Sequence, residues 1–253
     1  MNNELVSVVM PAHNSEKYIL LSIMSVLEQT HSNLELLIVD DNSTDDTVRI
    51  VESIKDKRIT LFKNHVNMGA AFCRNLAIQK SKGVFIAFLD SDDLWLPTKL
   101  EEQIDFMSKN SYFFTYTKYT EVDKLDIEIS GPETITFKKL LRCNYIGCLT
   151  VMYKREIFPD LSIPNNILRR NDYALWLLLS KKESCHLLPK VLSKYRTGST
   201  SSLSSISKRK LVSANAFMFK QLFNISTLKS YFYALRNVFY TTLKKFRWRR
   251  TIK

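Results

Sequence analysis

The sequence predicts an α/β protein built on a mainly parallel β-sheet with helices on both of its faces. Over the first hundred residues, short apolar runs alternate with stretches whose apolar residues recur at helical spacing. The apolar runs are almost continuous, which is typical of strands in parallel sheets because helices cover both faces. At 253 residues, the chain is long enough for one sizeable domain, or for a domain with an appendage.

The individual elements follow from these patterns in chain order. Strands are predicted at residues 5–10, 34–39, 59–62, 84–89, 112–119 and 190–195. Helices are predicted at residues 15–29, 44–54, 70–79, 99–107 and 173–180, and then at about 208–223 and 227–247. Ser43 or Thr44 is expected to cap the second of these helices.

Polar residues gather where three of the predicted strands end. Residues 11–14 follow the first strand, residues 40–43 follow the second and residues 90–93 follow the fourth. In a parallel sheet the carboxyl ends of the strands lie at one edge, and ligands bind there near a change in strand order. The sequence therefore predicts a binding site at this edge.

The sharpest motif is Asp90-Ser91-Asp92-Asp93, directly after an apolar strand. Three carboxylates within four residues repel one another unless a cation lies among them, and hard oxygen ligands suit Mg²⁺ or Mn²⁺. A turn with helix-capping acids is the alternative interpretation.

A second acidic pair, Asp40-Asp41, ends the second predicted strand. A helix cap explains part of this segment, but two acids at the same edge exceed what capping requires. One of the two carboxylates could accept the imide N–H of a uracil ring.

The chain resembles the family-2 inverting glycosyltransferases of the GT-A fold in four segments: VSVVMPAHNSEKYI, LELLIVDDNSTDDT, NMGAAFCRN and GVFIAFLDSDDLWLPTKLE. The motifs occur in the family's order and spacing, strongly over residues 4–105 and loosely over residues 106–205. Bacterial transferases that build O-antigen, capsule or lipopolysaccharide are similar in the same way.

The resemblance implies a division of the chain into a domain and an extension. Residues 1–206 would form a Rossmann-like GT-A domain, with a nucleotide-sugar-binding half at 1–109 and an acceptor half at 110–206. Residues 207–253 would form a basic helical extension. A Ser- and Thr-rich loop at residues 197–207 is a candidate lid.

The resemblance also implies roles for residues at the predicted edge. Nucleotide-sugar binding is implied for Pro11, His13, Asp41, Arg74 and Asp92. Asp93 is the implied ligand of Mn²⁺ or Mg²⁺. For Arg74, a surface charge on a helix is the alternative interpretation.

The family places a catalytic base downstream, often in a Glu-Asp pair that opens an aromatic helix. The matching segment here has Asn171 in place of the Glu and keeps the acid as Asp172, which is therefore the implied base. A carboxylate suits this task because it can accept the proton of an attacking hydroxyl. A helix-capping acid is the alternative. Many relatives also carry a His after a Tyr-Arg pair, but Arg196 is followed by Thr197, which leaves Arg196 as a candidate to face the diphosphate.

The basic charge of the chain is concentrated at its C-terminal end. Residues 184–253 hold 15 of the 37 Lys and Arg residues and none of the 25 Asp and Glu residues. Such a block usually binds phosphate, in lipid head groups or nucleic acid. The rest of the chain is slightly acidic, which argues against a nucleic-acid binder; a merely solvated tail is the alternative.

The last predicted helix separates its apolar residues from its basic ones. Its apolar stripe consists of Leu228, Tyr231, Phe232, Leu235, Phe239, Leu243 and Phe246, and the opposite side carries Lys229, Arg236, Lys244 and Arg247. This pattern is typical of a helix that lies in a membrane interface, so an anionic membrane surface is the expected partner of residues 207–253. Alternatively, the apolar stripe packs on the domain.

Cysteine usage and the apolar profile give an expected location. The four cysteines form no CxxC pair, so buried and reduced thiols in a cytosolic compartment are expected. The N-terminus lacks a signal-peptide pattern, and no window reaches the roughly 18–20 apolar residues of a membrane span. These features predict a cytoplasmic protein, peripheral at the inner face of the plasma membrane.

Together with the resemblance, these observations imply transfer of a hexose or N-acetylhexosamine from a UDP-sugar to a lipid-diphosphate-linked saccharide during synthesis of a cell-surface polysaccharide. A sugar-phosphate nucleotidyltransferase is one alternative, although it would require a Gly-rich loop after the first strand, where residues 10–18 contain no Gly. A non-catalytic, membrane-associated nucleotide- or phosphate-binding protein is the other, but it leaves the clustered acids without a purpose.

Overall fold

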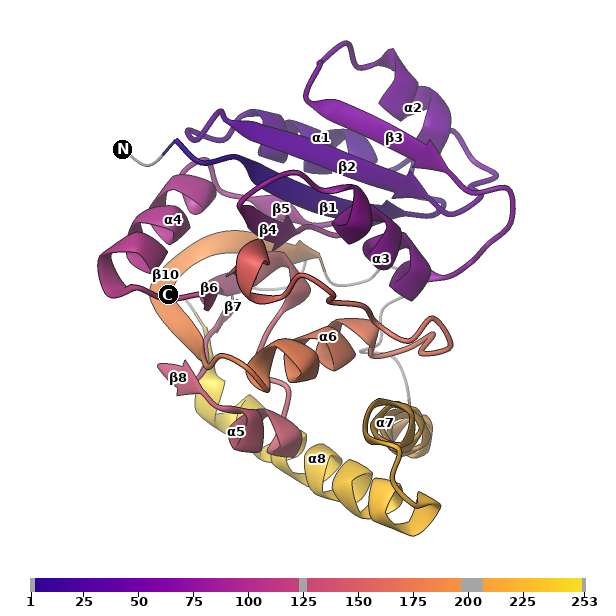
Figure 1. Cartoon of the computed structure of the whole chain (residues 1–253), viewed down its shortest axis with the longest axis vertical. Helices are drawn as coiled ribbons and strands as arrows, with labels where there is room; N and C mark the ends of the chain where they lie inside the picture. Colours follow the sequence, from indigo (N-terminus) through magenta and orange to yellow (C-terminus); the bar gives the residue numbers. More distant parts are fainter. Residues whose placement is uncertain (1–2, 123–126, 197–206, 252–253) are drawn as a thin grey trace.

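The structure, a computed structural model, describes residues 3–122, 127–196 and 207–251. The candidate lid at residues 197–207 therefore lies almost wholly outside the described residues. A sheet runs through the molecule, and helices cover both of its faces (Figure 1).

The N-terminal half has the predicted parallel strands with helices between them. Its strands lie side by side in the order β3-β2-β1-β4, and every neighbouring pair is parallel. The strands are β1 (Val6–Ala12), β2 (Leu34–Asp40), β3 (Ile59–Lys63) and β4 (Phe85–Phe88), and the helices are α1 (Ile19–Leu27), α2 (Thr47–Ser53), α3 (Ala70–Lys80) and α4 (Lys99–Asn110). The α/β prediction with a mainly parallel sheet is confirmed here.

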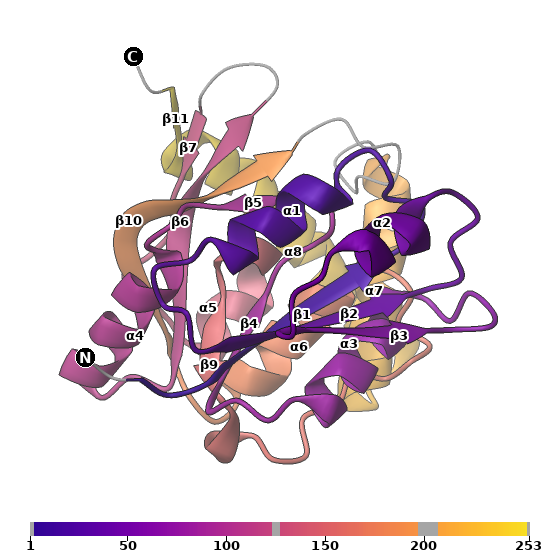
Figure 2. The same ribbon diagram turned by 90° about the horizontal axis from the view of Figure 1, so that it is seen from above.

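Two hydrophobic cores lie on opposite faces of this sheet. Because successive strand residues point to opposite faces, Val8 of β1 packs with Ile23 of α1, whereas Val9 packs with Ala77 of α3. In Figure 2 the N-terminal strands are seen nearly edge-on, with α1 and α2 on one side of them and α3 on the other. Burial on both faces explains the continuous apolar runs of the sequence.

The second half extends the sheet with antiparallel strands. Strand β9 (Met152–Lys154) lies between β4 and β6 (Phe114–Val122) and is antiparallel to both. Strand β10 (Cys185–Arg196) is parallel to β6. Four more short strands complete the sheet: β5 (Leu94–Trp95), β7 (Ile127–Ile129), β8 (Thr134–Ile135) and β11 (Arg249–Thr251). Like β9, they are not predicted by the sequence.

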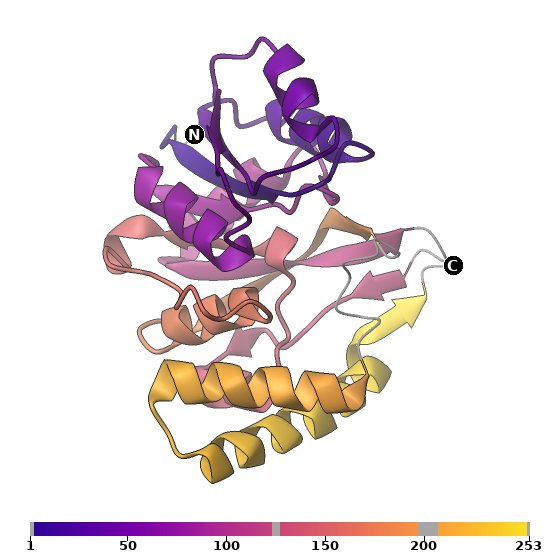
Figure 3. The ribbon, with the colours of Figure 1, turned by 90° about the vertical axis from the view of Figure 1, so that its right-hand side faces the viewer.

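The C-terminal helices pack on the second half of the molecule. Helices α7 (Lys208–Phe223) and α8 (Thr227–Trp248) lie side by side on the side farthest from β1–β3 (Figure 3). Phe219 and Ala234 belong to the same core as α6 (Asn171–Ser180), and α5 (Phe137–Arg142) contributes Leu140 to it. The extension is therefore continuous with the domain. Among the described residues, no helix combines the length and apolar character required to cross a bilayer.

Two helices begin later than predicted because the residues before them have other partners. Helix α1 begins at Ile19, after a turn in which the amide of Tyr18 donates to the Ser15 carbonyl. Helix α2 begins at Thr47, and the Asp45 carboxylate accepts from its amide at 3.0 Å. The expected cap at Ser43 or Thr44 is wrong, since both residues bond to Asn14 instead. All four cysteines are buried and free, as expected.

Candidate active site

Three loops converge at the carboxyl ends of β1, β2 and β4, as predicted. The amide of Asn14 donates to Ser43 Oγ at 2.9 Å, and the amide of Thr44 donates back to Asn14 Oδ1 at 2.8 Å. The hydroxyls of Ser15 and Ser91 are 2.7 Å apart and join the first loop to the third. These cross-loop bonds give the edge a fixed shape before any ligand binds.

The two acids after β2 have different surroundings. Asp40 accepts from the amide of Ser43 at 3.1 Å and forms the turn. Asp41 is 4% exposed, and its carboxylate accepts from the amides of Met68 and Gly69, both at 2.8 Å, and from Asn64 Nδ2 at 2.9 Å. Asp41 thus fixes the segment between β3 and α3 to the end of β2.

That segment brings a residue to the site that the sequence analysis missed. The Nδ2 atom of Asn67 lies 3.4 Å from each ring nitrogen of His13. The same atom donates to the Asp41 carbonyl at 3.3 Å. His13 and Asn67 are exposed, and Pro11 is half-buried at the end of β1. The NMG sequence that precedes α3 was the available signal, because it occupies the loop between β3 and α3 at the same sheet edge.

Asp93 is the most buried acid of the 90–93 loop. It is 1% exposed, and its Oδ1 accepts from the backbone amide of Arg196 at 2.9 Å. Its Oδ2 is buried and has no hydrogen-bond partner among the described residues. Burial, followed by the nearby carboxylates of Asp92 and Asp90, raises the pKa of Asp93 well above the usual carboxyl range.

These features fit a divalent cation. A buried carboxylate oxygen without a donor, next to a second acid, is stabilised when a proton or a cation binds it, and carboxylate oxygens are ligands that Mg²⁺ and Mn²⁺ accept. Among the described residues, no group of three or more His, Cys, Asp or Glu side chains is arranged so that it could hold a metal ion by itself. Mg²⁺ is commonly held by one or two carboxylates plus substrate phosphates, so such a cage is unnecessary.

Arg196 covers the same loop from the end of β10. Its Nε donates to the Asp92 carbonyl at 3.1 Å, and its guanidinium lies 4.4 Å from the centre of the Tyr18 ring. Arg196 is therefore a cation beside the acidic loop.

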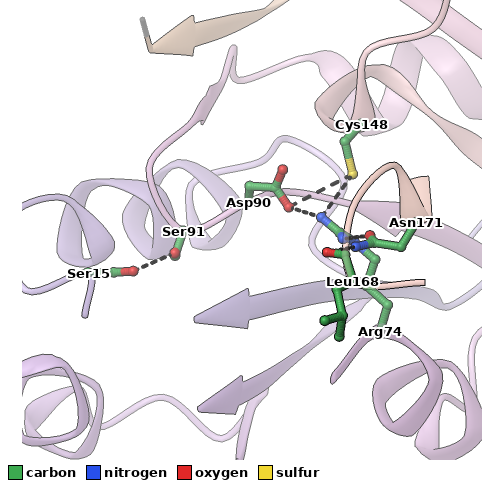
Figure 4. Close-up of polar contacts among 7 residues, drawn as sticks. All are labelled: Ser15, Arg74, Asp90, Ser91, Cys148, Leu168 and Asn171. Carbon is green, nitrogen blue, oxygen red and sulfur yellow. Dashed lines mark hydrogen bonds and ion pairs between the residues drawn. The ribbon is translucent and has the colours of Figure 1, made fainter. Parts of the chain in front are cut away.

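Arg74 joins the two halves of the site (Figure 4). The side chain is 5% exposed, and its Nη2 forms an ion pair with Asp90 Oδ1 at 2.5 Å. Its Nη1 donates to Asn171 Oδ1. Burial disfavours the charge on Arg74, but the carboxylate of Asp90, with a smaller contribution from Asp172, keeps the pKa of Arg74 above its ordinary value. Arg74 is thus a buried bridge, and the surface-charge alternative is wrong.

Asp172 lies in the first turn of α6, directly after the residue that Arg74 holds. It is half-buried, and within the described part of the chain its carboxylate accepts no hydrogen bond. The N-terminal end of α6 and the buried Arg74 guanidinium both place positive charge near this side chain. A carboxylate whose oxygens accept no hydrogen bond has room to accept a proton from a bound hydroxyl.

The fold and the site together define a class of protein. The β3-β2-β1-β4 sheet order, the acidic loop after β4 and the carboxylate in the first turn of α6 match the GT-A glycosyltransferases. The chain matches the family described as Glycosyl transferase family 2 over residues 7–161. The protein belongs to this family.

Known proteins are similar over most of the chain. The Escherichia coli protein WfgD, a UDP-Glc:alpha-D-GlcNAc-diphosphoundecaprenol beta-1,3-glucosyltransferase, is 43% identical over 209 residues, which cover 81% of each chain. TarS from S. aureus, solved with UDP, has a TM-score of 0.69 at 22% identity and covers 89% of this chain and 68% of its own. The mannosyltransferase PcManGT from Pyrobaculum calidifontis, solved with GDP-Man and Mn²⁺, has a TM-score of 0.65 at 16% identity, over 92% of this chain and 69% of its own.

Proposed function

We propose that this glycosyltransferase moves a sugar from a UDP-sugar to a hydroxyl of a saccharide, with inversion at the anomeric carbon. The supporting observation is the Arg74 bridge. Asp90 at the donor edge and Asn171 next to Asp172 bind the same guanidinium, so the donor loop and the candidate base lie on two sides of one buried contact.

In the proposed step, Asp172 accepts the proton of the acceptor hydroxyl while that oxygen forms a bond to C1 of the sugar. The bond from C1 to the phosphate oxygen breaks, and the UDP leaves with its electron pair. Attack from the face opposite the leaving group inverts the anomeric centre, so an α-linked donor gives a β-linked product.

The donor-binding residues are proposed to be Pro11, His13, Asp41, Arg74 and Asp92, with Asn67 added from the structure. The contacts of Asp41 and Arg74 indicate different modes of action. Asp41 holds the segment that carries Asn67, and Arg74 holds Asp90 beside the metal loop. The solved structure of TarS with UDP, which shares this fold, supports UDP as the nucleotide.

We assign the metal site to Asp93, with Asp92 beside it. A bound Mn²⁺ or Mg²⁺ would offset the negative charge that develops on the leaving diphosphate. The bare Oδ2 of Asp93 and its raised pKa support this assignment. PcManGT, which has a similar fold, was solved with Mn²⁺ bound, and this also supports the assignment.

We propose a hexose or N-acetylhexosamine as the transferred group and a lipid-diphosphate-linked saccharide as the acceptor. The name of WfgD specifies glucose and an acceptor linked to diphosphoundecaprenol, and that protein is 43% identical to this one. A role in cell-surface polysaccharide synthesis follows from such an acceptor.

An acceptor held in a bilayer requires the enzyme at its surface. Six large apolar side chains of α8 are exposed, and residues 208–210 on α7 add three exposed cations. We propose that this face contacts the anionic inner leaflet of the plasma membrane, because apolar insertion and attraction to anionic lipid act together there.

Transfer assays with a set of UDP-sugars test this function. With Mn²⁺ and a GlcNAc-diphosphate-lipid analogue, one UDP-sugar should be consumed and a β-linked product should form, whereas EDTA or Asp93→Asn should abolish turnover. Asp172→Asn should lower kcat by at least about 10²-fold with UDP affinity unchanged. Full activity in EDTA would exclude the metal, and an α-linked product would exclude inversion.

A further inference from the structure

Two buried asparagines lie between the C-terminal helices and the helix that carries Asp172. Asn215 of α7 is 0% exposed and Asn237 of α8 is 1% exposed, within a core of apolar side chains. An amide buried without hydrogen bonds costs about 1–3 kcal/mol, so the partners of these two side chains determine their role.

The asparagines belong to a directional chain of hydrogen bonds, formed by Arg170, Asn215, Asn237 and Tyr173. Arg170 Nε donates to Asn215 Oδ1 at 3.1 Å, and Asn215 Nδ2 donates to Asn237 Oδ1 at 3.0 Å. Asn237 Nδ2 donates to the Tyr173 hydroxyl at 2.8 Å, which donates in turn to the Leu140 carbonyl. A buried network in which each link has its partner favours one arrangement of the helices that it joins.

Arg170 adopts a backbone conformation that requires support. Its φ of 64° lies in the left-handed region, which costs a residue with a Cβ roughly 1 kcal/mol or more. Asn215 holds its side chain, and its guanidinium lies 5.0 Å from the centre of the Tyr173 ring. This conformation ends the preceding loop and sets the direction in which α6 begins.

The residues around Asp172 are therefore held from two directions. Arg74 of the donor half holds Asn171, and the C-terminal helices hold Arg170 and Tyr173. Within the described residues, the Asp172 carboxylate itself has no hydrogen-bond donor. Its position depends on the backbone of its neighbours.

We propose that Asn215 and Asn237 are positioning residues that fix Asp172 for catalysis, which makes α7 and α8 part of the catalytic unit. The inference rests on the proposed role of Asp172 as the base. Neither asparagine touches the reacting atoms. Each acts through the first turn of α6, where a shift of about 1 Å in a reacting group can cost roughly 10²-fold in rate.

Tyr173→Phe and Asn237→Ala in the full-length chain test the proposal. Tyr173→Phe removes one hydroxyl and keeps the ring that packs with Phe219 and Arg170. Each variant should lower kcat roughly 10-fold or more, with the KM for the UDP-sugar within about twofold of the wild-type value. The double variant should lose little more than the worse single variant, because both remove the same bond.

Tyr116→Phe is the matched control. Tyr116 is 1% exposed and donates to the Pro132 carbonyl at 2.6 Å, so the control also loses one buried phenol hydrogen bond, but in β6. Its kcat should stay within about twofold of wild type. If Tyr173→Phe and Asn237→Ala lose no more kcat than this control, or if their UDP affinity falls together with kcat, the asparagines are only structural and the proposal fails.

Hydrogen exchange separates this inference from the proposed function. The amides of the first two turns of α6 should exchange faster in Asn237→Ala and Tyr173→Phe than in Tyr116→Phe, with or without activity. A wild-type protein that transfers no sugar would overturn the function alone. Equal exchange rates in the three variants would overturn the positioning role.

Discussion

Asp41 and Asp93 are both buried acids at the same sheet edge, yet their surroundings are opposite. Asp41 accepts three N–H bonds from the segment between β3 and α3. Asp93 accepts one, leaves Oδ2 bare and lies near two other carboxylates, which together with burial raise its pKa. Asp41 therefore organises the loop, whereas Asp93 has a free carboxylate oxygen at the place to which we assign the cation.

Lys99 is a buried titratable residue whose side chain is basic instead of acidic. It is the first residue of α4 and is 0% exposed, and its Nζ has no hydrogen-bond partner among the described residues. The amine lies 3.9 Å from the centre of the Trp95 ring. Burial lowers the pKa of Lys99 well below its usual value. The neutral form therefore predominates over a wider pH range than in an exposed lysine, and the ring contact adds little attraction in that form.

Lys99→Met should stabilise the protein, because it replaces a buried amine without a hydrogen bond by an apolar chain of similar size. We expect about 1–3 kcal/mol in urea unfolding at neutral pH. The unfolded lysine keeps its proton up to about pH 10.4 and the folded one loses it earlier, so wild-type stability should rise with pH across that window and the variant should lack this rise. Lys109→Met, at an exposed site of the same helix, should change stability by less than about 0.5 kcal/mol. A destabilised Lys99→Met protein would contradict this account.

At the scale of elements, α8 is amphipathic, but the face that it packs on the domain is not its apolar face. Its small and polar residues, including Ser230, Ala234 and Asn237, face the domain. Its large apolar residues are exposed: Leu228 84%, Tyr231 42%, Phe232 62%, Leu235 59%, Phe239 62% and Leu243 48%. The side chains of Phe246 and Arg247 lie outside the description. The alternative in which the apolar stripe packs on the domain is wrong.

The basic side of α8 also differs from the sequence expectation. Lys244 donates to the Asn144 carbonyl at 2.9 Å, and Arg236 lies 5.0 Å from the centre of the Tyr233 ring, so both are used within the protein. Lys229 is exposed, as are residues 208–210 at the start of α7. Among the side chains that the structure describes, attraction to anionic lipid would therefore come from Lys229 and the three cations at residues 208–210.

Phe232→Ser combined with Phe239→Ser should weaken binding of the full-length protein to anionic vesicles by roughly 10-fold or more, since two exposed rings no longer insert. The binding that remains should fall with added salt, because it comes from the cations. Sedimentation with phosphatidylglycerol vesicles measures both effects. Leu20→Ser combined with Leu21→Ser, at exposed positions of α1, is the control and should bind as wild type does. Equal binding by both double variants would remove the membrane role of α8.

At the scale of the whole molecule, residues 207–251 are part of the fold. Helices α7 and α8 bury Ala216, Met218, Phe219 and Ala234 in the core that contains α6, and β11 pairs with β7. Loss of one buried Phe alone costs about 3–5 kcal/mol. The total stability of a domain is about 5–15 kcal/mol, so loss of all these contacts consumes most of it.

A chain that ends at residue 206 should therefore lose cooperative folding. Thermal unfolding followed by circular dichroism should give no sharp transition, or one shifted strongly to lower temperature. A chain that ends at residue 248 keeps α8 and loses only β11, so it should retain a sharp transition. If the chain of 206 residues unfolded like the full-length protein, α7 and α8 would be an independent extension after all.

Much of the N-terminal half could be predicted from sequence, because long-range structure there follows local pattern. Strands β1, β2 and β4 are buried on both faces, so their apolar runs are unmistakable, and their polar ends meet at one edge by the geometry of parallel strands. Asn67 and the strands β5, β7, β8, β9 and β11 were missed. Strands of two or three residues carry no periodicity, and pairing alone defines them.

The sequence alone determined the family, the order of the donor-half elements and the residues that share each face of α8, since the strand and helix periods fix these locally. Only the tertiary structure decided which face of α8 the protein covers, which carboxylate Arg74 binds and which acids of the edge already have donors. Those outcomes depend on contacts between residues about 16 to 103 positions apart in sequence. The pattern of a single helix or strand specifies what it can bury, and its neighbours in space specify what it does bury.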